Sequence, residues 1–260
     1  MLTRNLNNAR EAWKSGDFEL SKSAHDKPAV ETHISHGEYL KSLIYGGLDG
    51  TVTTFAVVAG VSGASLSPGV VLILGFANLI ADGLSMAVGD FLSTKAQNEY
   101  NRSERDRESW EVENHPAGEK QELIEIYREK GIDLEDANKI VDTISKYPSA
   151  WVDIMMVEEL SIVSEEESPL KNSAVTFISF IIFGFIPLAA YVVSRFVPVF
   201  GENTFMVASF LTGVTLFILG SLKYRFTLRN PFVSGLEMLI VGGLASGAAY
   251  LIGILLSGLA

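Results

Sequence analysis

The chain has 260 residues, of which 48% are hydrophobic and 20% charged, and its formal net charge is −11. This acidic balance argues against nucleic acid or anionic lipid as a partner and suggests that the protein binds cations. The sequence contains no cysteine, which excludes disulfides, thiolate metal sites and cysteine nucleophiles.

The mean hydropathy of +0.26 is an average over very different regions. Residues 41–93 and 170–260 are apolar, whereas residues 1–40 and 94–169 are polar and charged. This distribution is typical of a membrane protein with a water-exposed insert. We therefore expect an all-α membrane protein.

Residues 1–37 carry charges throughout and lack the apolar core of a signal peptide. We expect a cytosolic, partly flexible arm, followed by a first membrane segment that itself directs insertion. His33 and His36 could bind a metal if this part of the arm were helical. Solvated loop histidines are the more common outcome.

Two apolar segments follow, over about residues 41–63 and 69–92. Each is long enough to cross a bilayer, which takes about 20 helical residues. The second loses its apolar character at Ser93, but no proline or glycine follows before His115-Pro116. The second membrane helix should therefore continue into water as a charged extension and end there.

The rest of the acidic insert predicts three further helices, over about 118–130, 133–145 and 150–162, with Asp133 as an N-cap. Three more apolar segments, at about 173–196, 204–222 and 232–259, complete a set of five transmembrane helices. In the last of them, Gly243 and Gly247 form a small-xxx-small pair that favours close helix packing.

These patterns divide the chain into four regions: a cytosolic arm (1–37), transmembrane helices one and two (38–93), a cytosolic acidic helical domain that binds metal (94–169), and transmembrane helices three to five (170–260). The orientation follows from Lys223, Arg225 and Arg229, which lie in one short loop. The positive-inside rule places that loop in the cytosol. Counting spans back places the insert and the N-terminus on the same side.

Polar residues inside the first two spans need an explanation. Asn78, Asp82, Met86 and Asp90 recur every four residues and share one helix face, and Asp49 lies in the first span. A carboxylate in hydrocarbon costs at least about 2.5–3.5 kcal/mol, so it normally faces a protein interior or a water-filled cavity. For Asp49 a functional role is favoured. Asp82 and Asn78 fit helix-to-helix hydrogen bonding equally well, and Asp90 is close enough to the interface to be solvated.

Met86 limits the kinds of metal ion that these residues are expected to bind. A lone methionine in an apolar helix usually packs, but a thioether beside carboxylates suits a transition metal such as ferrous iron better than magnesium or calcium. Carboxylates also take protons, so metal release could be coupled to proton entry. Glu237 lies near the start of the fifth span. Its side chain either lines the entrance to the metal path or extends to the membrane–water interface.

The insert offers a second group of ligands. Glu104, Glu108 and Glu111 share one helix face, and like charges at this spacing repel unless a cation lies between them. A second acidic helix follows, and Met155, Met156 and Glu159 occur together on the last helix of the insert. A glutamate and methionine site for divalent metals is one interpretation; a solvated acidic surface, partly neutralised by neighbouring arginines, is the other.

Residues 45–50 (Tyr-Gly-Gly-Leu-Asp-Gly) and 77–90 (Ala-Asn-Leu-Ile-Ala-Asp-Gly-Leu-Ser-Met-Ala-Val-Gly-Asp) closely resemble the vacuolar iron transporter family. The resemblance extends through the acidic insert, Met155 to Glu159 and Leu236-Glu237-Met238, and covers roughly residues 38–260. The arm of 37 residues lies outside it. One departure is Gly89-Asp90-Phe91, where the family often has Gly-Glu-Tyr and the charge is kept.

The resemblance implies a homodimer of five-helix protomers that exports Fe²⁺, with Mn²⁺ a further substrate, from the cytosol by proton antiport. The family's path between the protomers corresponds to Asp49 and Met86, to which our reading adds Asp82, Asn78 and Glu237. Its metal-binding residues correspond to Glu108, Glu111, Glu119, Glu122, Met155, Met156 and Glu159. The protein would be a secondary transporter without a prosthetic group, in the cytoplasmic membrane of a prokaryote or the vacuolar membrane of a eukaryote.

Two other classes remain open. A membrane di-metal oxidoreductase would want Glu-x-x-His pairs, and the four histidines lie in the arm or at His115. A membrane-anchored metal sensor would not need Asp49 or Met86 in the bilayer.

Overall fold

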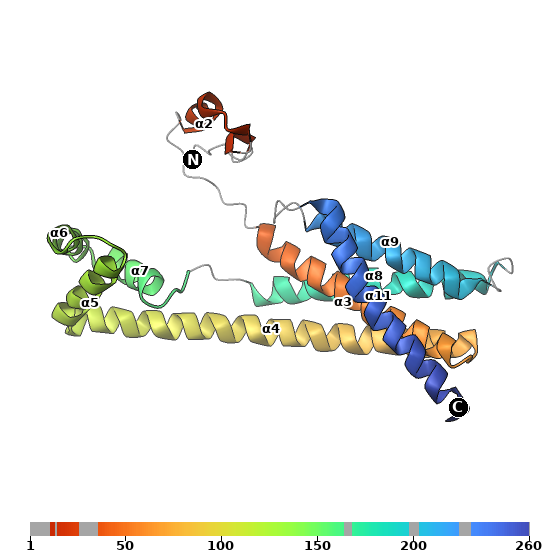
Figure 1. Ribbon diagram of the computed structural model, residues 1–260. Helices are drawn as coiled ribbons and strands as arrows, with labels where there is room; N and C mark the ends of the chain where they lie inside the picture. The colour runs from red at the N-terminus through yellow and green to blue at the C-terminus, as the bar shows by residue number, and fades with distance from the viewer. Residues whose placement is uncertain are drawn as a thin grey trace. The chain divides into compact units, whose positions relative to one another are not determined.

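The computed structural model describes residues 11–13, 15–25, 36–163, 168–197, 203–223 and 230–259, and all regular secondary structure in these ranges is helical (Figure 1). The chain separates into two compact units, residues 1–40 and 41–260. In the first unit, α2 (Phe18–His25) begins after Asp17, whose carboxylate accepts a hydrogen bond from the backbone N–H of Leu20 at 3.0 Å. His33 and the side chain of His36 lie outside the described residues, so the expectation of solvated histidines and the alternative of a metal site both stay open.

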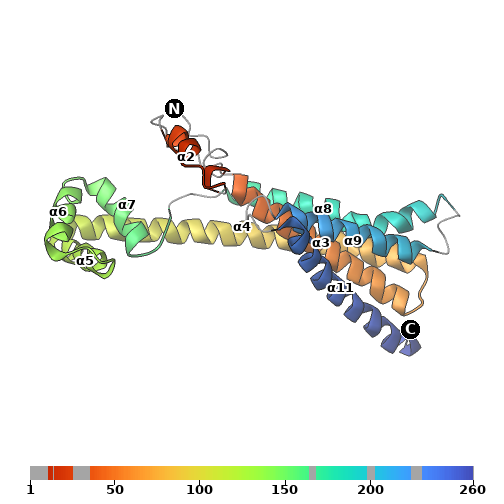
Figure 2. The ribbon, with the colours of Figure 1, turned by 45° about the horizontal axis from the view of Figure 1, so that its top comes forward.

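Five helices are long and apolar enough to cross a membrane, as the sequence predicts. They are α3 (His36–Gly63), α4 (Pro68–Asn114), α8 (Pro169–Ser194), α9 (Thr204–Leu222) and α11 (Pro231–Leu256). Three of them begin with a proline in the first turn, where its missing N–H is not needed by the helix. Figure 2 shows α8 running along the apolar half of α4, and α9 packs in turn against α8 and α11.

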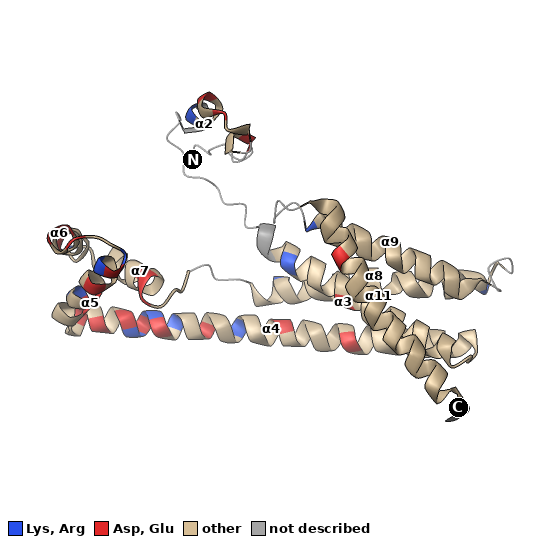
Figure 3. Cartoon of the chain, viewed as in Figure 1, with Lys and Arg blue, Asp and Glu red and all other residues tan. Residues whose placement is uncertain are grey.

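The second membrane helix continues beyond its apolar part as a charged extension. This confirms the prediction, which rested on the absence of proline and glycine between Ser93 and His115. α4 has 47 residues, and a helix of that length is about 70 Å long, more than twice the roughly 30 Å of bilayer hydrocarbon. Its apolar half can span a membrane, and its other half, from about residue 94, carries most of the charged side chains of the helix (Figure 3). We treat residues 94–114 as lying outside the membrane-spanning segment.

Between α4 and α8 the chain forms α5 (Pro116–Glu129), α6 (Leu134–Ile144) and α7 (Pro148–Glu158), which gather around the charged end of α4. The predicted cap is present: the carboxylate of Asp133 accepts a hydrogen bond from the N–H of Asp136 at 2.9 Å. Apolar residues of all four helices form one core. α7 ends at Glu158 rather than near residue 162, so Glu159 caps the helix instead of lying within it.

Glycines set how closely the membrane helices approach, but not the pair that the sequence suggested. A Cβ added to Gly50 of α3 would lie 2.5 Å from the carbonyl oxygen of Phe180, and one added to Gly253 of α11 would lie 2.1 Å from that of Gly60. Gly243 and Gly247 have no described atom within 4 Å of such a Cβ. The face of α11 that packs against α3 therefore contains Gly253 and not Gly243 or Gly247. The predicted role of Gly243 and Gly247 in close helix packing is wrong for contacts within the chain.

Candidate metal centre

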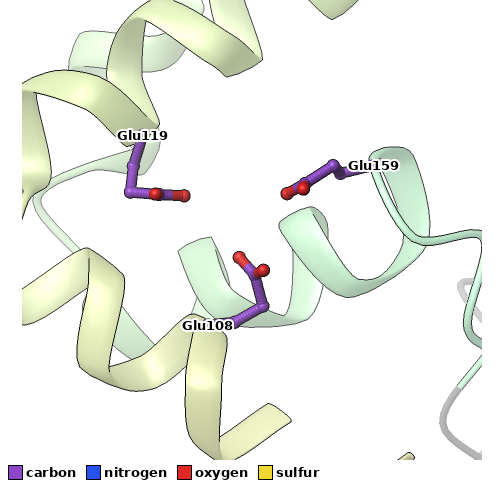
Figure 4. Close-up of side chains that lie close together, drawn as sticks. All are labelled: Glu108, Glu119 and Glu159. Carbon is purple, nitrogen blue, oxygen red and sulfur yellow. The ribbon is translucent and has the colours of Figure 1, made fainter. Parts of the chain in front are cut away.

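Three glutamates from three parts of the chain point toward one another at the charged end of α4 (Figure 4). Glu108 comes from the α4 extension, Glu119 from the first turn of α5, and Glu159 from the residue that caps α7. One carboxylate oxygen from each lies within 4.8 Å of the others. This is the separation that a single cation could bridge.

Local structure brings the three side chains together. His115-Pro116 ends α4 and starts α5, so the first turn of α5 returns toward the helix it has just left. Glu119 lies in that first turn, where the positive end of the helix dipole favours an acidic side chain. Beyond Glu159 the chain leaves α7 through Ser161, which has a left-handed backbone with φ of +57°.

Two of the three glutamates are buried and the third is half-buried, so their carboxylates need hydrogen-bond or charged partners. Glu108 is 0% and Glu119 7% exposed. Among the described residues, both carboxylate oxygens of Glu108 and one oxygen each of Glu119 and Glu159 have no hydrogen-bond partner. Burying a charged group without compensation is strongly unfavourable. These orphaned oxygens fit a bound cation, because a metal ion would supply the missing partner.

Burial also changes the protonation of the cluster. Desolvation, together with repulsion from neighbouring carboxylates, raises the pKa of Glu108 and of Glu119 to about 7. The same causes raise the pKa of Glu159. Without a metal, the cluster therefore holds protons near neutral pH, and a metal ion must displace them to bind.

These raised pKa values predict a pH-dependent stability. A carboxyl group whose pKa rises on folding binds more protons when folded, so its contribution to stability is complete below its unfolded pKa. That contribution is lost as the pH rises through about 7 for Glu108 and Glu119. We expect the melting temperature of the metal-free insert, followed by fluorescence of the buried Trp151, to fall between about pH 5 and pH 8. A double change of Glu108→Gln and Glu119→Gln should flatten this dependence, and a melting temperature that rises over the same range in the wild type would contradict it.

The other predicted ligands of the insert occupy different surroundings. Glu111 pairs with Arg107 at 2.5 Å, and Glu122 is exposed, although its charge contributes to the raised pKa of Glu119. Met155 and Met156 are 0% and 1% exposed and belong to the apolar core of the insert. Of the five predicted glutamate ligands, the structure thus brings three into one cluster.

The predicted path residues lie on α3, α4 and α11. Asp49, Asn78, Asp82 and Met86 are all partly buried. Met86 packs against the apolar core of the membrane helices. Glu237 is exposed, and its carboxylate lies 3.9 Å from the Nζ atom of Lys223.

Asp90 has a role that the sequence did not indicate. Its carboxylate accepts a hydrogen bond from the hydroxyl of Thr176 on α8 at 2.5 Å. The side chain therefore joins α4 to α8 where α4 leaves the apolar region, instead of being solvated as one reading of the sequence allowed. Because the partners are 86 residues apart, spacing along one helix could not have revealed the contact.

Replacing Thr176 by valine removes this bond while keeping the shape of the side chain. We expect a loss of roughly 1–3 kcal/mol in unfolding free energy, because a partly buried carboxylate loses a charge-assisted hydrogen bond. Thr212→Val is the matched control, since buried Thr212 donates to the carbonyl of Ala208 in its own helix. Thermal unfolding in detergent should separate the two variants, and equal melting temperatures would argue against the Asp90 contact.

Comparison with known proteins agrees with the family resemblance. The model of the VIT family matches residues 40–254. A vacuolar iron transporter of Toxoplasma gondii is 40% identical over 97% of this chain and 89% of its own length. One of Plasmodium falciparum is 38% identical over 98% of both chains, and vacuolar iron transporter 1 of Oryza sativa subsp. japonica is 34% identical over 90% of this chain and 91% of its own.

The first two matches correct one expectation, because an alignment over 97–98% of the chain includes most of the 37-residue arm that we had placed outside the resemblance. The family match and the relatives named as iron transporters agree on one assignment. The chain belongs to the VIT family.

Proposed function

We propose that this protein is a secondary transporter that moves ferrous iron out of the cytosol in exchange for protons, with Mn²⁺ and other divalent transition metals as further cargo. The observation that carries this proposal is the convergence of three glutamates, two buried and one half-buried, at one end of α4, a helix whose apolar half carries Asp82 and Met86. Membership of the VIT family, and relatives named as vacuolar iron transporters, support iron as the cargo.

The insert, residues 94–169, is proposed as a cytosolic domain that captures the metal. Glu108, Glu119 and Glu159 would be the primary ligands, and Glu111 and Glu122 would add negative charge around them. Carboxylates alone favour hard ions, so the thioethers of Met155 and Met156 would be needed to favour ferrous iron. The cytosolic side for the insert and the arm rests on the basic loop, of which Arg225 and Arg229 lie outside the described residues.

The transport path is proposed to include Asp49 and Met86, with Asp82, Asn78 and Glu237 contributing, between two protomers of a homodimer. All of these residues except Glu237 are partly buried, which supports a path through the protein. Large apolar side chains that remain exposed on α4 and α11 support a second protomer. A carboxylate that can hold either a metal ion or a proton, but not both, exchanges the two. That property would couple export to proton entry.

The membrane is proposed to be the vacuolar one in a eukaryotic cell, consistent with the names of the relatives, and the cytoplasmic one in a prokaryote. The function is tested by Fe²⁺ uptake into inside-out vesicles with the vesicle interior acidic. We expect accumulation that stops when an ionophore collapses the pH gradient. Metal-dependent oxygen consumption without accumulation would favour the oxidoreductase, and metal binding without accumulation would favour the sensor.

A further inference from the structure

A single arginine spans the carboxylates around the metal centre. Arg107 lies in the α4 extension, directly before Glu108, and its guanidinium contacts three glutamates of the same helix. Its Nε atom lies 3.1 Å from an oxygen of Glu104, and Nη1 lies 2.5 Å from an oxygen of Glu111. Both contacts are hydrogen bonds. They hold the guanidinium beside the cluster.

The contact with Glu108 is of a different kind. Nη2 of Arg107 lies 2.9 Å from Oε1 of Glu108, yet that oxygen has no hydrogen-bond partner with acceptable geometry among the described residues. The guanidinium therefore neutralises Glu108 by proximity without occupying its lone pairs. Because 41% of the Arg107 side chain is exposed, it can move into solvent without disturbing the core of the insert.

The charge of Arg107 reaches the whole cluster. It counteracts the effect of burial by lowering the pKa of each of the three glutamates that converge. Arg105 lies two residues earlier, on a different side of α4, and pairs instead with Asp153 of α7. The two arginines share a helix and a charge, but the one at 107 is directed to the metal centre.

We propose that Arg107 is the counter-ion of the metal-free glutamate cluster and that an arriving metal ion displaces it, so that this side chain sets how tightly the insert holds metal. The inference rests on the proposed capture of metal by Glu108, Glu119 and Glu159. Binding is then an exchange of one cation for another. A guanidinium near a divalent ion repels it, which keeps the affinity low enough for the metal to be passed on.

This role predicts effects of opposite sign on the metal-free and metal-bound protein. Without metal, loss of the guanidinium leaves the carboxylates to repel one another, so the protein is destabilised. With metal, the same loss removes a competitor and a repulsive charge, so binding is strengthened. A purely structural arginine would lower the stability of both forms and would not tighten binding.

The test uses the full chain in detergent at pH 8, with Mn²⁺ as a probe that resists oxidation, titrated calorimetrically into the wild type, Arg107→Gln and the control Arg105→Gln. We expect roughly tenfold tighter binding for R107Q, from the removal of one repulsive charge at short range. Its metal-free melting temperature should fall and its metal-induced rise should grow, whereas R105Q should bind as the wild type does. Adding Glu108→Gln to R107Q should cancel the gain, which assigns the effect to this cluster.

Arg107→Leu covers the case in which R107Q does not fold. Leucine is a good helix former and removes the positive charge, so R107L should also bind Mn²⁺ more tightly than the wild type. Unchanged or weaker binding by these variants, with wild-type binding intact, would overturn the role of Arg107 and leave the capture site standing. Failure of the wild type to bind Mn²⁺ would overturn the capture site itself, and this inference with it.

Discussion

Replacing Asp49 by asparagine is expected to lower proton-driven Fe²⁺ uptake into inside-out vesicles by a factor of roughly 10 or more, which corresponds to at least about 1.4 kcal/mol in the barrier to transport. The reason is that the proposed path loses an anionic ligand in a region where water cannot replace it. Asparagine keeps the size of the side chain, so packing against neighbouring helices is retained. The same change also removes a group that can carry a proton.

Asp153→Asn provides the control, because it makes the same chemical change at an exposed position on α7. Uptake by this variant should match the wild type at equal protein levels. Comparison with Asp82→Asn tests the same chemical change at the other aspartate of the proposed path, on α4. If D49N transported Fe²⁺ at the wild-type rate with the same dependence on the pH gradient, Asp49 would not belong to the path.

The second large effect is expected at the metal centre, where Glu108→Gln should weaken metal binding by the insert roughly 100-fold through the loss of a charged ligand. The same variant should raise the melting temperature of the metal-free protein at pH 8, because burial and repulsion from neighbouring carboxylates, which raise the pKa of Glu108 to about 7, make its ionised form unfavourable. Binding and stability thus move in opposite directions. Calorimetric titration with Mn²⁺ and thermal unfolding of the same sample measure both.

Glu113→Gln is the matched control, since Glu113 lies on the same helix extension but is exposed and does not join the cluster. It should leave the affinity and the melting temperature unchanged. A Glu108→Gln variant that bound Mn²⁺ as tightly as the wild type would show that the convergent oxygens are not a metal site.

The membrane helices were predictable because their signal is local. Apolar length defines a span, and the absence of proline and glycine after Ser93 was sufficient to predict that α4 continues into water. The cap at Asp133 was likewise visible, because a capping side chain and its partner lie three residues apart. In each case the residues that determine the structure are neighbours in the sequence.

The metal centre was predictable only in part. Helical spacing placed Glu104, Glu108 and Glu111 on one face, but it could not tell that α5 and α7 would bury Glu108 while Glu111 pairs outward with Arg107. The acidic surface partly neutralised by arginines, which we had treated as the alternative to a metal site, is present beside the cluster. Arg107 lies three residues after Glu104 and four before Glu111, a spacing that favours ion pairs on a helix. These two contacts could therefore have been predicted from the sequence.

Contacts between distant helices were not predictable from one sequence. The bond between Asp90 and Thr176 and the choice of Gly253 rather than Gly247 for close packing depend on the rotation of each helix about its axis. Small residues occur all along α11, so composition did not identify the packing stripe.

The most direct test of the account is anomalous diffraction from crystals soaked in Fe²⁺ under anaerobic conditions, because it locates the metal independently of any change in activity. We predict an iron peak bonded to carboxylate oxygens of Glu108, Glu119 and Glu159, with the guanidinium of Arg107 turned away from Glu108. Iron bound elsewhere in the insert, with these three carboxylates left without metal, would contradict the account.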